Sequence, residues 1–215
     1  MVNEYVDYNP CQRVEKPKFH NVGQRKLKTG EDEKFFAAFE SEWAYDICQI
    51  IINTGLRQCD ATGLLWSEVD LDEKEIRLVQ DKTSREVVVP LNESATKVLR
   101  KRLASRNCEL VFPSPKSGQR GMLVKTAIKG AVERSGVSRI TVHDLRRTTA
   151  SRLLDAGVDH ITIASILGHT DLRMILRYAQ SSKAKRKAVK RLEKQNRAKI
   201  VPTDKKKKHS QGVSA

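Results

Sequence analysis

A helical spacing of apolar residues runs through most of this chain and is interrupted once by a strand pattern, which limits the possible folds more than any other feature. Two runs rich in β-branched residues, at 75–79 and 85–89, flank a polar turn and predict a β-hairpin. Elsewhere apolar residues recur every three or four positions, which predicts helices. The helical runs cover residues 31–54 (two helices), 57–65, 95–106, 122–134, 143–155, 161–167 and 172–178. The sequence therefore predicts a mainly α-helical fold with a small antiparallel β-sheet.

Capping residues and glycines mark the expected ends of these helices. Thr29 is placed to cap the first helix, and either Asn92 or Ser94 is placed to cap the helix that begins at 95. Gly55 and Gly168 directly follow helical runs. Glycine is favoured there because it adopts the left-handed backbone of a helix end without strain. These positions predict a series of separate helices rather than a few long ones.

The length of 215 residues is typical of one domain with appendages. Residues 1–30 hold prolines and glycines without a sustained period, which predicts a linker or the end of a preceding unit. The folded unit is expected to begin near Thr29 and to occupy residues 31–180. Residues 181–215 are expected to form a basic helix, to about Asn196, followed by a disordered tail.

The charge balance indicates a polyanionic partner. The chain holds 41 basic and 26 acidic residues, a formal net charge of +15. Two zones carry the excess: residues 94–152, with 14 basic and 3 acidic residues, and residues 181–215, with 13 and 2. In the first zone the charges alternate with apolar residues that must pack, so the charges lie on a folded surface. DNA or RNA is the expected partner of that surface.

Several classes of protein are excluded by what the sequence lacks. No apolar stretch is long enough for a membrane span, and the first ten residues do not resemble a signal peptide, so a cytoplasmic protein is expected. Cys11, Cys48, Cys59 and Cys108 form no C-x-x-C pair, and we expect them to be reduced and structural. No carboxylate cluster is present to hold a metal ion, and no cofactor is predicted.

Six scattered residues combine the chemistry of a cationic site with a phenolic nucleophile. Asp60 lies three positions after the first arginine of the set, close enough to orient its guanidinium. A helix break at Gly168 is needed to bring the second histidine and the tyrosine together, because nine residues of continuous helix would separate them. The six residues are Arg57, Lys82, His143, Arg146, His169 and Tyr178.

The surroundings of these residues resemble the tyrosine recombinases, or phage integrases, over residues 29–178. Each short motif alone would be a weak signal, but all six positions and their local contexts match the family pattern together. The motifs are Thr54-Gly55-Leu56-Arg57 with Asp60, Leu64 to Asp70, Lys82-Thr83 before Val89-Pro90-Leu91, His143-Asp144-Leu145-Arg146, and Leu167-Gly168-His169 with the step to Tyr178. The resemblance implies the catalytic core of a DNA breaking and rejoining enzyme.

The resemblance also implies a mechanism without metal or ATP. Tyr178 attacks a DNA phosphate, which gives a 3′-phosphotyrosyl link and a free 5′-hydroxyl. Arg57 and Arg146 bind the non-bridging oxygens, and His169 adds a further donor. Lys82 protonates the leaving 5′-oxygen, and His143 assists proton transfer.

Partners and further domains follow from the same resemblance. Family members act as homotetramers on double-stranded DNA sites and often dock the segment after the tyrosine on a neighbouring protomer, although this chain alone is expected to be monomeric. Residues 1–30 then correspond to the remnant of a DNA-binding clamp domain. Nucleoid association and a role in integrating or excising a mobile element are also implied. The chain departs from the family pattern at Thr149 and at Met174-Ile175.

Two other functions fit part of the pattern. Residues 153–178 have the spacing of a helix-turn-helix in a non-catalytic DNA-binding regulator, which leaves Arg57, Lys82 and Tyr178 without a role. A type IB topoisomerase uses a similar site but rejoins the same strand. Individually, the six residues also have ordinary explanations, such as surface ion pairs for Arg57 or a packed ring for Tyr178. Their joint occurrence favours recombination.

Overall fold

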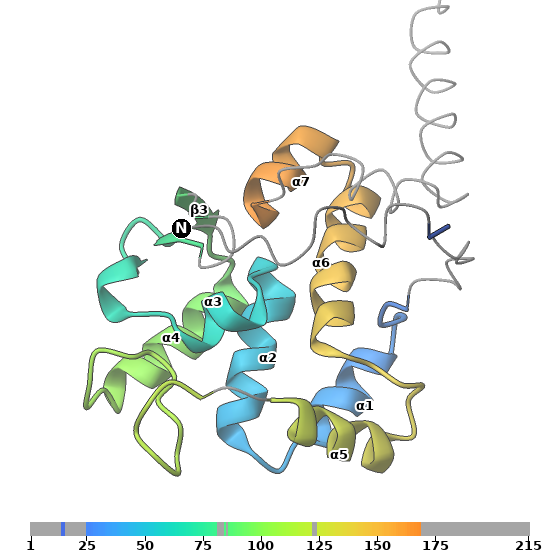
Figure 1. Ribbon diagram of the computed structural model, residues 1–215, viewed down its shortest axis with the longest axis horizontal. Coiled ribbons are helices and arrows are strands. Elements are labelled where there is room, and N and C mark those ends of the chain that lie inside the picture. Colours follow the sequence, from blue (N-terminus) through green and yellow to red (C-terminus); the bar gives the residue numbers. More distant parts are fainter. Residues whose placement is uncertain (1–13, 16–24, 81–83, 85, 122–123, 169–215) are drawn as a thin grey trace, which may run out of the picture.

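The computed structural model describes residues 14–15, 25–80, 84, 86–121 and 124–168 of the chain (Figure 1). Its elements, in chain order, are α1 (Glu31–Ala37), α2 (Glu42–Thr54), α3 (Gln58–Thr62), a 3-10 turn (Trp66–Glu68), β1 (Val69–Asp70), β2 (Glu75–Val79), β3 (Glu86–Pro90), α4 (Glu93–Ala104), α5 (Lys125–Ser135), α6 (Val142–Ala156) and α7 (His160–Leu167). The predicted helices at 172–178 and 183–196 lie outside the described residues.

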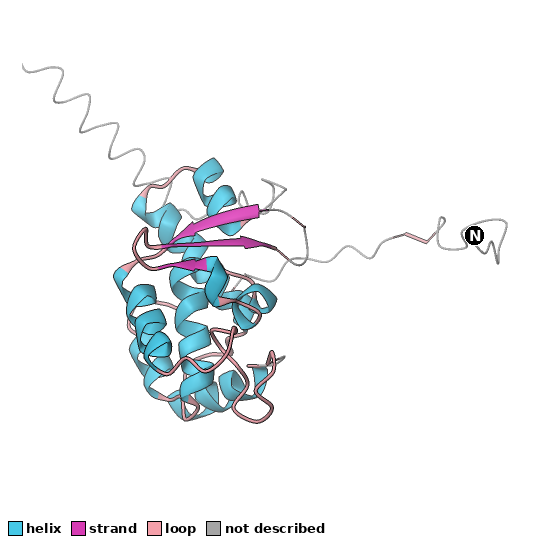
Figure 2. Cartoon of the chain, turned by 90° about the vertical axis from the view of Figure 1, so that its left-hand side faces the viewer, coloured by secondary structure: helices cyan, strands magenta, loops and turns pink. Residues whose placement is uncertain are grey.

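The sheet is small, antiparallel and ordered β1-β2-β3, and helices lie above and below its strands in Figure 2. Ile76 pairs with Val89 and Leu78 with Val87, and all four side chains are buried on the face toward the helices. Because side chains alternate between the two faces of a strand, the intervening residues are exposed. The prediction of a mainly α-helical fold with a small antiparallel sheet is confirmed, and β1 is an additional strand that the sequence pattern did not indicate.

The core is built around α2, which contacts both α4 and α6 (Figure 1). Ile47, Ile50 and Ile51 are fully buried on α2, as is Cys48 beside them. Burial raises the pKa of the Cys48 thiol, because an apolar surrounding disfavours the thiolate. This thiol is free, as the sequence indicated. The consequence for the site is that the carboxyl end of α2 is fixed by the core.

Some helix boundaries differ from the predicted ones. The helix expected over 57–65 ends at Thr62, because Leu65 leaves the helical path and pairs with Leu110 in an isolated bridge. The first helix is capped by Gly30, at φ +84°, and not by Thr29. Of the two proposed caps for α4, Asn92 is the one used, since its side chain accepts a hydrogen bond from Ala95 N–H.

The packed part of the described chain begins at Arg25, several residues earlier than the sequence pattern indicated. The backbone N–H of Leu27 donates to Thr148 Oγ1 on α6 at 3.0 Å, and the Leu27 side chain is buried. Arg25 pairs with Glu31 at the start of α1. This segment was missed because so short a run has no periodicity. None of the helices in the described ranges has the length and apolarity that a bilayer span requires.

Candidate functional site: two arginines at the end of α7

Helix α6 begins with a reciprocal cap that fixes the position of its first turns. The Thr141 side chain accepts from Asp144 N–H, and the Asp144 carboxylate accepts from Thr141 N–H at 3.0 Å. His143 lies in the first turn and is exposed, whereas Arg146, one turn later, is 4% exposed. The two residues share one side of α6, as their spacing of three predicts.

Arg146 joins two segments that are distant in the sequence. Its Nη1 donates to the carbonyl oxygen of Gly55 at 2.6 Å, just beyond the end of α2. Its Nη2 donates to the carbonyl oxygen of Leu167 at 2.6 Å, at the end of α7. Hydrogen bonds at two corners fix the plane of the guanidinium. Carbonyls near a helix end carry partial negative charge, which suits a cation there.

Arg57 reaches the same end of α7 from the start of α3. Its Nη2 donates to the Gly168 carbonyl oxygen at 3.0 Å, one residue beyond the carbonyl that Arg146 binds. Its Nη1 lies 3.7 Å from Asp60 Oδ2, an ion pair without a hydrogen bond. Within the described residues, both of these atoms are buried without a hydrogen-bond partner. A buried donor without a partner costs about 1–3 kcal/mol, so such a group is a candidate for ligand binding.

Two glycines allow this close approach. Gly168 has φ +58°, and a Cβ there would lie 2.4 Å from the side-chain amide of Gln80. Gly55 has φ +75°, and a Cβ there would lie 2.3 Å from Leu167 Cδ2. A Cβ at either position would force the buried side chain of Gln80 or Leu167 to move, so glycine suits both positions sterically as well as by the backbone angle.

Thr149 fastens α6 to the end of α2 beside the site. Its Oγ1 lies 2.8 Å from the carbonyl oxygen of Ile52 and 3.3 Å from that of Ile51, both in the last turn of α2. The Ile51 carbonyl oxygen already accepts from Gly55 N–H, so the carbonyl that gains a partner from the hydroxyl is that of Ile52. The departure from the family pattern at Thr149 thus has a structural role.

Comparison with known proteins identifies the family. The model described as "Phage integrase family" matches residues 26–185. The chain belongs to this family.

Individual relatives agree with this assignment. The tyrosine recombinase XerC of Corynebacterium glutamicum is 33% identical over 153 residues, which is 66% of this chain and 49% of XerC. The crystal structure of XerA recombinase matches with a TM-score of 0.68 and 26% identity, over 81% of this chain and 66% of XerA. A Tn1549 transposon integrase in complex with circular intermediate DNA shares the fold, with a TM-score of 0.65 and 19% identity over 80% of this chain and 68% of that one. The chain spans about half the length of the curated relatives it matches.

Three of the predicted site residues of this integrase-family chain lie outside the described residues: Lys82, His169 and Tyr178. Their sequence neighbours are described. Gln80 and Ser84 stand on either side of residues 81–83, and Ser84 N–H donates to the Gln80 carbonyl oxygen at 2.8 Å. Gly168, which accepts from Arg57, directly precedes His169. In the described part of the chain, no group of three or more His, Cys, Asp or Glu could hold a metal ion.

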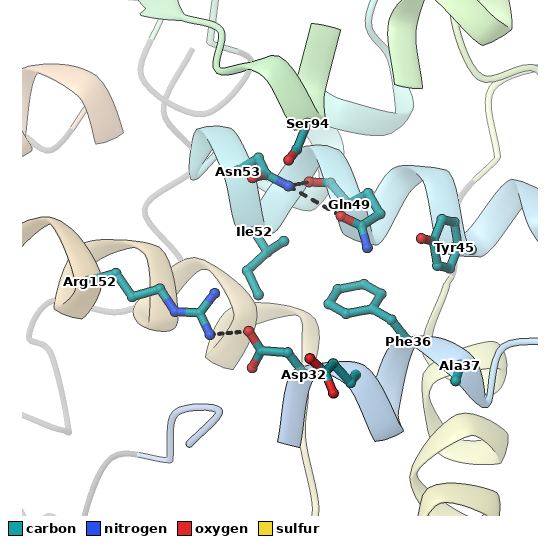
Figure 3. Close-up of a pocket in the computed structure, with 10 residues that line it drawn as sticks. Asp32, Phe36, Ala37, Tyr45, Gln49, Ile52, Asn53, Ser94 and Arg152 are labelled. Atoms are coloured by element: carbon teal, nitrogen blue, oxygen red, sulfur yellow. Dashed lines mark hydrogen bonds and ion pairs between the residues drawn. The ribbon is translucent and has the colours of Figure 1, made fainter. Parts of the chain in front are cut away.

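A pocket of about 540 Å³ lies elsewhere on this integrase-family chain, between α1, α2 and α6 (Figure 3). Phe36 and Tyr45 meet edge to face in its wall. Arg152, the arginine that lines it among the described residues, is paired with Asp32 (Figure 3). None of the predicted site residues that the structure describes, Arg57, His143 and Arg146, lines this pocket. With its cation neutralised by a carboxylate, the pocket is not suited to a phosphate.

Gln80 was not among the predicted residues, although the strand pattern points to it. Ile76 and Leu78 are the buried residues of β2, and alternation places Gln80 on the same face. A polar amide at an inward position beyond a strand is unusual enough to mark it for attention. It was overlooked because the predicted strand stops at Val79.

Proposed function

We propose that this chain is the catalytic part of a site-specific DNA recombinase that cleaves and rejoins strands through Tyr178. The observation that carries the proposal is the meeting of Arg57 and Arg146 on adjacent carbonyls at the end of α7. Two guanidiniums held side by side suit the non-bridging oxygens of one phosphate, because each presents paired donors in a fixed plane. The membership in the phage integrase family supports the same chemistry.

In the proposed reaction, Tyr178 Oη attacks the scissile phosphorus and the bond from phosphorus to the 5′-oxygen breaks. Arg57, Arg146 and His169 stabilise the negative charge that develops on the non-bridging oxygens. Lys82 gives a proton to the leaving 5′-oxygen, and His143 assists removal of the tyrosine proton. The energy of the broken ester is retained in the phosphotyrosine, so a 5′-hydroxyl from a second duplex can reverse the step and join new strands.

Double-stranded DNA is the proposed substrate. Support comes from the basic excess of residues 94–152, which include exposed lysines on α4 and α5. We further propose that four copies assemble on two DNA sites, with single chains monomeric in the absence of DNA. Asp60, whose side chain is buried, would orient Arg57 through their ion pair.

The covalent step is tested by trapping it. We expect the full chain, mixed with labelled random-fragment DNA in EDTA and without ATP, to form an adduct that survives SDS. Tyr178→Phe removes the nucleophilic oxygen and should abolish the adduct while leaving salt-sensitive DNA binding unchanged. Gel mobility of the denatured complex measures the first result, and binding at several salt concentrations measures the second.

The alternative functions predict different outcomes. An adduct that persists in Tyr178→Phe would contradict the assigned nucleophile. DNA binding without any adduct, also in a longer chain carrying the preceding domain, would favour the helix-turn-helix regulator. Sequencing the trapped DNA gives the preferred site. Joining of two different duplexes at that site distinguishes a recombinase from a topoisomerase, which would only relax supercoils.

Assembly is tested through the basic segment at 181–215. Its apolar positions, including Ala188 and Leu192, have helical spacing and would dock on a neighbouring protomer. Deleting 181–215 should reduce tetramer formation on paired sites by tenfold or more, with a smaller effect on binding to one site. Light scattering and band shifts measure the two quantities. Unchanged assembly after the deletion would refute this role.

A further inference from the structure

Gln80 occupies an unusual place at the end of β2. It continues the inward alternation of Ile76 and Leu78 and is 1% exposed. Its amide packs against the Cα of Gly168, so closely that a Cβ on Gly168 would lie 2.4 Å from both Nε2 and Oε1. The side chain of Gln80 therefore packs directly against the end of α7.

The backbone of the same residue closes the turn of the hairpin. The Gln80 carbonyl oxygen accepts from Ser84 N–H at 2.8 Å, and Ser84 has a left-handed backbone at φ +48°. Residues 81–83, with Lys82 in the middle, connect these two fixed ends. The base of the turn is thus tied to the residue whose side chain touches α7.

On the other side of the Gln80–Gly168 contact lie the carbonyls that bind the two arginines. Gly168 presents its carbonyl oxygen to Arg57, and Leu167 presents its own to Arg146. Gln80 therefore links the described base of the hairpin, two residues before Lys82 in the sequence, to the carbonyls that bind both arginines.

We propose that Gln80 is a positioning residue. It fixes the base of the hairpin turn at residues 80–84 relative to the arginine pair, and thereby determines where Lys82 is held. The proposal rests on the proposed function, in which Lys82 is the general acid. Gln80 itself does not touch the DNA; it acts through the turn that it closes. A buried amide suits this task because it is long enough to reach Gly168 and carries donors and an acceptor for orienting hydrogen bonds, which an apolar chain of the same length lacks.

The test separates proton donation from all other contributions to cleavage. The substrate is a nicked duplex of the sequence recovered from the trapped adducts, made with an ordinary scissile phosphate or with sulfur in place of the bridging 5′-oxygen. A thiolate leaves without protonation near neutral pH, because thiols have pKa values near 8.5. Loss of general acid assistance therefore slows the ordinary substrate but not the sulfur one.

We expect Gln80→Met to slow single-turnover cleavage of the ordinary substrate by about tenfold or more, since small misplacements cost up to about 100-fold. On the sulfur substrate its rate should stay within about threefold of the unmodified protein. Lys82→Ala should give the same pattern with a larger loss. Leu78→Met is the matched control, a change on the same face of β2 two residues earlier, and should leave both rates unchanged.

Each other outcome decides against the proposal. Equal losses on both substrates would mean that Gln80 supports the site in general, and normal rates on both would mean that it has no positioning role. If Gln80→Met unfolds in a thermal melt, Gln80→Leu fills a similar volume and is judged by the same two rates. Failure of the unmodified protein to form a Tyr178 adduct would overturn the proposed function as well, and it is seen before any Gln80 variant is made.

Discussion

Arg146→Lys should lower the rate of covalent adduct formation by about 100-fold to 1,000-fold, the loss typical of removing one transition-state donor. A lysine has one ammonium in place of the planar guanidinium and cannot bind the carbonyls of Gly55 and Leu167 while facing a phosphate. The loss should appear in the single-turnover rate at saturating DNA. Binding of DNA should weaken much less, because phosphate contacts away from the scissile site remain.

Arg147 offers a matched control for this change. It is the next residue of α6, half-buried, and pairs with Asp144 Oδ1 at 3.0 Å instead of entering the site. Arg147→Lys keeps the charge and should alter adduct formation by threefold at most. A thermal melt of both variants accounts for the buried carbonyl that Arg146→Lys leaves unpaired. Similar losses of activity in the two variants would contradict the special role of Arg146.

The helices and the hairpin of this chain were predictable because each depends on local patterns. The periodicity of residues 42–54 and the β-branched residues on both sides of the polar turn appear in the sequence itself. Glycines beyond α2 and α7 marked two helix ends correctly. By contrast, β1 is two residues long and has no pattern of its own, and it forms because β2 offers a free edge.

In the described part of the candidate site, the sequence holds signals for the arginines but none for the groups that they bind. Arg57, Asp60 and Arg146 were chosen from residue type and from family resemblance. That both arginines bind backbone carbonyls at 167 and 168 has no sequence signal, because every residue carries a carbonyl. Which carbonyls are used depends on how α2, α6 and α7 pack, and packing is a property of the whole fold.

The second large effect concerns stability, and we expect it at Gly55. Gly55→Ala adds a methyl group 2.3 Å from Leu167 Cδ2, at a backbone angle of φ +75°. Leu167 is 1% exposed and its carbonyl accepts from Arg146, so relief of the clash must move buried groups of the site. The left-handed backbone costs about 1–2 kcal/mol and overpacking about 1–3 kcal/mol more. Denaturant unfolding should show a loss of about 2–5 kcal/mol.

Gly136 separates the two parts of that cost. It ends α5 with a similar left-handed backbone, φ +66°, but a Cβ there meets nothing within 4 Å. Gly136→Ala should therefore lose only the backbone part, about 1–2 kcal/mol. Leu167→Val removes Cδ2 and should make Gly55→Ala less costly than it is in the unmodified chain, a coupling that a double-mutant cycle measures. Equal losses at Gly55 and Gly136, without coupling to Leu167, would show that the ends of α2 and α7 do not depend on this contact for their spacing.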